Sequence, residues 1–242
     1  MRATDAPGWL SRRQADVPAG DEWLSDAERE VLARLRVAPR RASWRLGRWT
    51  AKAALGSWLE VEPAAVEVLA APDGAPEAWL HGARATVSLS LSHRGDRALA
   101  VVVDAPAVVG CDLELVEPRS GAFIREWLTE TEQQLVFGCD EARQALLANL
   151  IWTAKEAAAK VRREGLRLDV RAAVVSFAER GATTEGWRPV HVDWGDGLAT
   201  AGWWRTEPGW VMTIAASPAW TAPPARLSLS ATTPAASAAD PD

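Results

Sequence analysis

Two acidic residues, Asp112 and Glu114, lie two positions apart in the apolar segment Val-Val-Gly-Cys-Asp-Leu-Glu-Leu. The alternation of this segment predicts a strand with both carboxylates on one face and Cys111, Leu113 and Leu115 on the other. Two carboxylates a few ångströms apart repel each other unless a cation lies between them. Taken alone, however, such a pair is more typical of the polar face of an edge strand.

A second group of residues that could do chemistry is Trp152-Thr-Ala-Lys155-Glu156-Ala-Ala-Ala-Lys160. On a helix, these four named side chains share one side. An ordinary surface pair of Glu and Lys, worth about 0.2–0.5 kcal/mol, would also explain the spacing. The chain has 24 Arg but only 3 Lys, and two of the three lysines lie here. Because Lys is a compact charge suited to a phosphate or a developing oxyanion, we interpret this helix face as a candidate catalytic site.

The third group is the run Ser88-Leu-Ser90-Leu-Ser92-His93, which precedes Arg94 and Gly95. Small hydroxyls and an imidazole at a strand end can bind phosphate, although a single His is more often structural. The segment has no G-x-S-x-G motif, which disfavours a Ser-His-Asp hydrolase.

The composition narrows the kind of metal that the acids could bind. The 242 residues include 2 Cys and 3 His, which excludes a disulfide framework and a four-thiolate zinc site, and the histidines show no HxxxH spacing. A bound metal would therefore take carboxylate oxygens, which suit Mg²⁺ or Mn²⁺. A net charge of −5 argues against a nucleic-acid-binding protein.

The expected compartment depends on two kinds of apolar segment that the sequence does not show. No apolar run approaches the roughly 18 residues of a membrane helix, and the first residues contain no apolar signal region. We expect a cytoplasmic protein in which Cys111 and Cys139 are free thiols, with Cys111 buried and without a redox role.

The elements that must position these groups indicate an α+β fold. Capping boxes at Ser25–Glu28 and Thr129–Glu132 begin helices, and longer helices are predicted over about 41–59 and 141–163. Strands are predicted near 65–69, 85–91, 97–103, 108–115, 170–177, 191–194, 198–205 and 210–215. We predict a loose tail over 1–20, α+β halves over 21–106 and 107–221, and a disordered tail over 222–242. We find no convincing sequence repeat, although two similar halves would explain the layout.

The order S-x-S-H, G-x-D-x-E and W-[ST]-x-K-E-x-x-x-K, with gaps of about 20 and 40 residues, resembles that of the 4′-phosphopantetheinyl transferases. The length resembles the two-halved, Sfp-type branch of that superfamily. This resemblance implies two α+β halves in a pseudo-twofold arrangement, with the active site between them. It also implies a monomer, because two internal halves make a dimer unnecessary for building the site.

The resemblance implies transfer of the 4′-phosphopantetheine arm of coenzyme A to a serine of an apo acyl or peptidyl carrier protein, with release of 3′,5′-ADP. Asp112, Glu114 and Glu156 would hold Mg²⁺, with Mn²⁺ as the alternative ion. Glu156, or a metal-bound water, would deprotonate the serine, and Lys160 would neutralise the transferring phosphoryl group. The residues that would contact coenzyme A phosphates are Lys155, Ser92 and His93.

A basic segment fits the rest of such a ligand. Six Arg and Lys52 occur between positions 34 and 52, and no acidic residue lies between Glu30 and Glu60. A solvated helix face is the usual explanation of a charge run, but solvated faces normally mix both signs. By the resemblance, Arg41 and Arg48 would bind the 3′-phosphate of coenzyme A.

Two other functions use the same residues. One is a Mg²⁺-dependent phosphohydrolase acting on coenzyme A or a nucleotide, and the other is a non-catalytic module that binds coenzyme A or a carrier protein. The sequence does not say whether the carrier belongs to fatty acid, polyketide or nonribosomal peptide biosynthesis.

Overall fold

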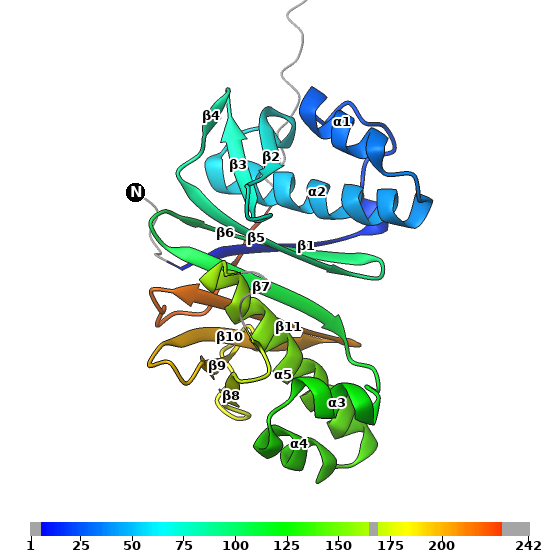
Figure 1. Ribbon diagram of the computed structural model, residues 1–242. Helices are drawn as coiled ribbons and strands as arrows, with labels where there is room; N and C mark the ends of the chain where they lie inside the picture. The colour runs from blue at the N-terminus through cyan, green and yellow to red at the C-terminus, as the bar shows by residue number, and fades with distance from the viewer. Residues whose placement is uncertain (1–5, 165–168, 229–242) are drawn as a thin grey trace, which may run out of the picture.

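The computed structural model describes residues 6–164 and 169–228. It confirms the α+β prediction: two sheets lie in the middle of the molecule, and helices cover their outer faces (Figure 1). None of the helices in the described ranges is both long and apolar enough to cross a membrane.

The N-terminal half contains two helices and six strands. Its long helix α2 packs on the sheet formed by the first strand and the last two strands of this half. In chain order the elements are β1 (Gly8–Arg13), α1 (Asp26–Arg34), α2 (Ala38–Leu59), β2 (Val66–Ala70), β3 (Pro76–Leu80), β4 (Ala83–Arg84), β5 (Val87–Arg94) and β6 (Arg97–Asp104). Two short 3₁₀ helices, Gln14–Asp16 and Pro63–Ala65, connect them.

The C-terminal half repeats this plan with one more short helix. Its elements are β7 (Val108–Leu115), α3 (Gly121–Trp127), α4 (Glu130–Phe137), α5 (Glu141–Arg162), β8 (Val174–Phe177), β9 (Arg188–Asp193), β10 (Ala199–Glu207) and β11 (Trp210–Ser217). A last strand, β12 (Ala225–Arg226), returns to the N-terminal sheet. Both predicted capping boxes are confirmed, and so is the predicted strand over 108–115.

The two main sheets share a connectivity. In one, the order is β12-β1-β6-β5, and in the other it is β7-β11-β10-β9-β8. Each half therefore begins with a strand that pairs antiparallel with the last strand of a hairpin. The pseudo-twofold arrangement itself stays a prediction.

The predicted tails require a correction. Residues 8–13 form β1, which pairs with β6 along its whole length, and Trp9 and Leu10 are buried. Residues 225–226 add β12 to the outer edge of β1. The composition of these segments is typical of tails, but apolar side chains at Trp9 and Leu10 are sufficient to anchor a strand on both faces of a sheet. Residues 229–242 of the predicted C-terminal tail lie outside the described residues.

The two halves also repeat in sequence, although the repeat is too short to be convincing without the fold. The segment Glu-Trp-Leu-Ser-Asp-Ala-Glu at 22–28 matches Glu-Trp-Leu-Thr-Glu-Thr-Glu at 126–132. The segment Trp-Thr-Ala-Lys occurs at 49–52 and again at 152–155. In both halves the first segment leads into a capping-box helix and the second lies in a 22-residue helix.

Candidate functional site

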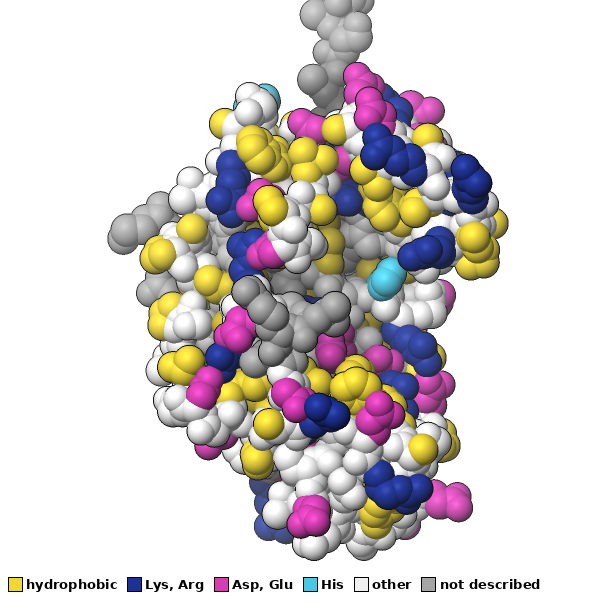
Figure 2. All heavy atoms as spheres, viewed as in Figure 1, with side chains coloured by type: hydrophobic (Ala, Val, Ile, Leu, Met, Phe, Trp, Pro, Cys, Tyr) yellow, Lys and Arg dark blue, Asp and Glu magenta, His cyan; other side chains and the backbone are white. Residues whose placement is uncertain are grey.

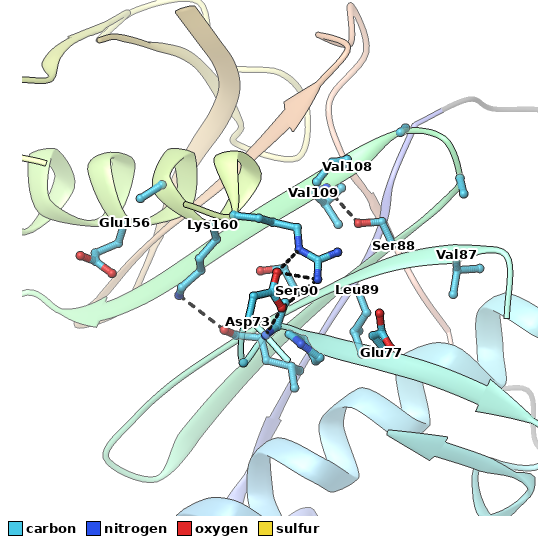
Figure 3. Close-up of a pocket in the computed structure, with 18 of the residues that line it drawn as sticks. Asp73, Glu77, Val87, Ser88, Leu89, Ser90, Val108, Val109, Glu156 and Lys160 are labelled. Atoms are coloured by element: carbon cyan, nitrogen blue, oxygen red, sulfur yellow. Dashed lines mark hydrogen bonds and ion pairs between the residues drawn. The ribbon is translucent and has the colours of Figure 1, made fainter. Parts of the chain in front are cut away.

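A cavity of about 880 Å³ lies between the two halves. The turn before β3, strand β5 and the start of β7 form part of its wall, and α5 with the segments around Trp127 and Val170 forms the rest. In Figure 3, Glu156 and Lys160 project from one side of α5 toward β5. A space of this size, bounded by several elements and lined by apolar residues together with both acidic and basic side chains, is typical of a small-molecule site.

Helix α5 carries Glu156 and Lys160, the two residues that the sequence analysis predicted to be catalytic. It starts at an Asp140 cap, whose side chain accepts from the amide of Arg143, and an apolar stripe packs it on β7 and β11. Glu156 and Lys160 are four residues apart, one turn of helix, so they project in the same direction. Both line the cavity.

Strand β7 comes close to this helix because position 110 is a glycine. A Cβ on Gly110 would lie 1.9 Å from the carbonyl oxygen of Ala157, so any side chain there would push α5 away. The close approach brings Asp112 to Lys160, whose Nζ lies 3.0 Å from Asp112 Oδ1. Lys160 also donates to the carbonyl of Cys111, at 2.8 Å.

The serines before His93 join the two halves. The hydroxyls of Ser88, Ser90 and Ser92 on β5 accept from the amides of Val109, Cys111 and Leu113 on β7. Ser92 also donates to Asp112 Oδ1, at 2.7 Å, and so fixes one oxygen of that carboxylate. The alternating serines thus act as a side-chain ladder between β5 and β7, a role that the sequence pattern did not reveal.

Two arginines hold the other acid of the pair. Glu114 Oε2 lies 2.9 Å from Arg119 and 3.3 Å from Arg94. Arg119 in turn donates to the side-chain oxygen of Asn149, at 2.7 Å, and Asn149 is fully buried on α5. Because Asn149 also donates to the carbonyl of Glu117, this network ties the segment after β7 to α5.

Burial, together with the nearby charge of Asp112, raises the pKa of two acids, Glu156 and Glu114. Burial, and then the negative charge of Asp112, raises the pKa of Glu156, although Lys160 acts in the opposite direction. Burial likewise raises the pKa of Glu114 against the effect of Arg119. For Lys160, burial would lower the pKa, but Asp112 and its neighbours outweigh it, so the pKa is raised and the ammonium stays charged.

The donor set fits a divalent cation in chemistry, although it is not arranged as a closed site. Within 6–164 and 169–228, no group of three or more His, Cys, Asp or Glu side chains is placed to hold a metal ion. The buried Asp112 Oδ2, however, has no hydrogen-bond partner, and the three carboxylates repel one another. Carboxylate oxygens of this kind suit Mg²⁺ or Mn²⁺.

Lys155 requires a correction, because it does not face the cavity. Its side chain is fully buried, and its Nζ lies 2.8 Å from Glu132 Oε2 and 3.0 Å from the carbonyl oxygen of Trp127. A phosphate could reach this ammonium only if a buried ion pair broke, which is strongly unfavourable. Lys155 is therefore a structural residue rather than a phosphate ligand, and the capping acid Glu132 is its partner.

The basic segment is used largely inside the fold. Arg41 donates to the carbonyl oxygens of Leu32 and Leu35 at the end of α1. Arg48 donates to the carbonyl of Val68 and stacks on a Trp ring. Lys and Arg side chains still gather over α1 and the start of α2 in Figure 2, and binding of a phosphate by Arg41 or Arg48 stays a prediction.

The structure shows where the other candidate residues lie, and their roles in the reaction stay predictions. His93 is exposed at the end of β5, and Trp152 lines the cavity in edge-to-face contact with Trp127, at 5.4 Å between ring centroids. Cys111 is buried as predicted, and burial raises the pKa of its thiol to about 12.

An ion pair between the two halves, at the wall of the cavity, was not predicted from the sequence. Arg163, in the left-handed conformation at the end of α5, donates to both oxygens of Asp73 in the turn before β3, at 2.9 and 3.0 Å. The two residues are 90 positions apart, and each belongs to a different half. A sequence gives no local signal for such a pair, because neither residue type nor spacing distinguishes it.

Residues 108–214 match the model of the 4′-phosphopantetheinyl transferase superfamily. The match begins with β7 and ends within β11, so it contains Asp112, Glu114, Glu156 and Lys160. It supports that superfamily and, in general terms, phosphopantetheinyl transfer. No curated protein is significantly similar to the chain.

Proposed function

We propose that the protein transfers the 4′-phosphopantetheine arm of coenzyme A to a serine of an apo acyl or peptidyl carrier protein and releases 3′,5′-ADP. The observation that carries this proposal is the position of Glu156 and Lys160 in the cavity between the halves, beside Asp112 and within the superfamily match. The Sfp-type branch, a cytoplasmic location and a monomeric state belong to the same proposal.

In this reaction, the serine oxygen forms a bond to the pantetheine-linked phosphorus, and the bond from that phosphorus to the bridging oxygen of the diphosphate breaks. The protein contributes mainly by positioning and by neutralising charge. Lys160, which stays charged, would neutralise the transferring phosphoryl group. Glu156, with its raised pKa, would accept the proton of the serine hydroxyl.

Asp112, Glu114 and Glu156 would hold the divalent ion, which when bound withdraws charge from the diphosphate oxygens. Ser92 and the pair Arg94 and Arg119 would orient the first two of these acids through the contacts described above. Contacts of Ser92, His93, Arg41 and Arg48 with the phosphates of coenzyme A are part of the proposal.

The test measures the covalent modification of the carrier protein. Incubation with coenzyme A, Mg²⁺ and a panel of apo carrier proteins should add about 340 Da, the mass of the phosphopantetheine group, to at least one carrier. A carrier whose acceptor serine is replaced by Ala is the control and should gain nothing. Release of 3′,5′-ADP without a mass gain on any carrier would instead favour a phosphohydrolase, and binding without either product would favour a non-catalytic module.

A further inference from the structure

A buried pair of Glu and Lys occurs once in each half, and we call these pairs the N-terminal clamp (Glu28 and Lys52) and the C-terminal clamp (Glu132 and Lys155). The Nζ to Oε2 distance is 2.7 Å in the first and 2.8 Å in the second. Both lysines are fully buried, and the acids are 0% and 3% exposed. Charged residues this deeply buried normally require a partner, which each clamp supplies.

Each clamp joins the same three elements. The acid closes the capping box of a short helix, by accepting from the amide of Ser25 or Thr129. Its other oxygen accepts from a strand amide, Val68 on β2 in one half or Val175 on β8 in the other, at 2.9 and 2.8 Å. The lysine comes from the long helix, so one carboxylate fixes a helix start, a strand and a second helix.

The aromatic residues around the clamps correspond as well. Trp23 meets Trp49 edge to face at 5.3 Å between ring centroids, and Trp127 meets Trp152 in the same way at 5.4 Å. These are the tryptophans of the repeated segments. The two clamps are therefore built alike, apart from Arg48, whose Nε lies 3.8 Å from Glu28 Oε1, and one serves as a control for the other.

The clamps differ in what they hold. In the C-terminal half, the residue after Lys155 is Glu156, which lines the cavity, and Lys155 also donates to the carbonyl of Trp127, another lining residue. In the N-terminal half, the residue after Lys52 is Ala53, which is buried in the core under α2.

We propose that the C-terminal clamp is a positioning device for the metal site, and that the N-terminal clamp has only a structural role. This inference rests on the proposed function. A helix can rotate about its axis and slide along it, and either movement carries Glu156 away from Asp112. Because Lys155 is adjacent in sequence, an ion pair that fixes its Nζ between Glu132 and the Trp127 carbonyl also fixes the rotation and the height of Glu156.

The experiment compares two matched double variants, Lys155→Met with Glu132→Gln and Lys52→Met with Glu28→Gln. Methionine fills the space of lysine without its charge, and glutamine keeps an oxygen that accepts from the cap or strand amide. Removing both charges avoids a buried unpaired ion, which a single change would leave. The probe is Mn²⁺, measured by titration calorimetry, together with amide hydrogen exchange of the metal-free proteins.

We expect the C-terminal double variant to bind Mn²⁺ about tenfold more weakly or worse, as is usual when a residue that orients a metal ligand is lost. Amides of α5 near Glu156 should exchange faster in this variant. The N-terminal double variant should keep the Mn²⁺ affinity of the unaltered protein. Its loss of thermal stability should be similar to that of the C-terminal double variant. An equal change of affinity in both variants, or none in the C-terminal one, would overturn the inference.

The outcomes separate the inference from the proposed function. An unaltered protein that binds Mn²⁺ but modifies no carrier contradicts the transferase proposal, and the two affinities still decide the role of the clamp. If the unaltered protein binds no Mn²⁺, the metal part of the proposed function is wrong, and hydrogen exchange near Glu156 decides alone. Should a double variant fail to fold, Lys155→Arg and Lys52→Arg form the second matched pair, and the first is expected to weaken Mn²⁺ binding.

Discussion

Helices α2 and α5 are both 22 residues long, both carry Trp-Thr-Ala-Lys, and both bury that lysine against the acid of a capping box. They differ at the positions that follow. Where α5 has Glu156 and Lys160, α2 has Ala53, which is buried, and Ser57, which donates to the carbonyl of Ser228. The same scaffold is thus present in both halves, whereas the charged pair on the long helix, Glu156 and Lys160, is present only on α5.

The largest expected effect on this comparison of α2 and α5 comes from replacing the buried lysine of one helix at a time. We expect Lys155→Met to cost about 3–5 kcal/mol of unfolding free energy, because the carboxylate of Glu132 would remain buried without an opposite charge. Lys52→Met should cost less than Lys155→Met, since Arg48 Nε lies 3.8 Å from Glu28 and partly replaces the lysine. Urea denaturation of both variants measures the difference. A loss below about 1 kcal/mol in either would mean that the pair is not a buried ion pair in solution.

The next prediction concerns the position at which the two helices differ. Glu156→Gln should lower the rate of carrier modification by about 10²–10³, the loss typical of a group that acts on the developing charge. The fold should stay intact, because the side chain faces the cavity rather than the core. Glu126→Gln, at an exposed acid on α3, is the matched control and should leave the rate unchanged. A Glu156→Gln variant with a normal rate would remove this residue from the site.

A smaller effect should appear in stability as a function of pH. Burial and Asp112 raise the pKa of Glu156, so its folded pKa lies above its unfolded value. Such a group contributes stability at low pH that is lost as the pH rises through the folded pKa. Without metal, the unaltered protein should therefore become less stable relative to Glu156→Gln as the pH increases from about 4.5 toward neutrality. Thermal unfolding of both proteins across this range gives the sign, and a difference that does not change with pH would contradict it.

The smallest expected effect is at the bridge between the halves. Asp73→Ala removes the partner of Arg163, but both side chains are partly exposed, at 40% and 37%. Such pairs contribute about 0–1 kcal/mol, so the unfolding free energy should hardly change. If the halves instead depend on this bridge, the unfolding transition of the variant would split into two steps, which calorimetry would reveal.

Much of the site was predictable because its signals are local. The alternation around Asp112, the helical spacing of Glu156 and Lys160, and the two capping boxes each depend on a few neighbouring residues. The scarcity of lysine correctly marked all three lysines as unusual. It could not separate Lys160, which faces the cavity, from Lys52 and Lys155, which are buried, because the side of a helix that meets the core depends on distant strands.

Other contacts could not be predicted from the sequence for the same physical reason. The charge of the basic segment was identified correctly, but Arg41 and Arg48 donate to carbonyl oxygens at the end of α1 and on β2, positions that only the folded chain brings near them. Phosphate binding by Ser92 stays a prediction, and the structure adds that the alternating serines of β5 accept from the amides of β7. The repeated segments were the one signal for the clamps that the sequence did contain.

Residue types and short spacings were enough to predict the α+β class, both long helices, the strand over 108–115 and the resemblance that residues 108–214 support. Long-range packing decided which charges are available for chemistry. Burial and pairing assign Lys155 to the scaffold and leave Lys160 beside Asp112, because the cost of desolvating a charge depends on everything that packs around it.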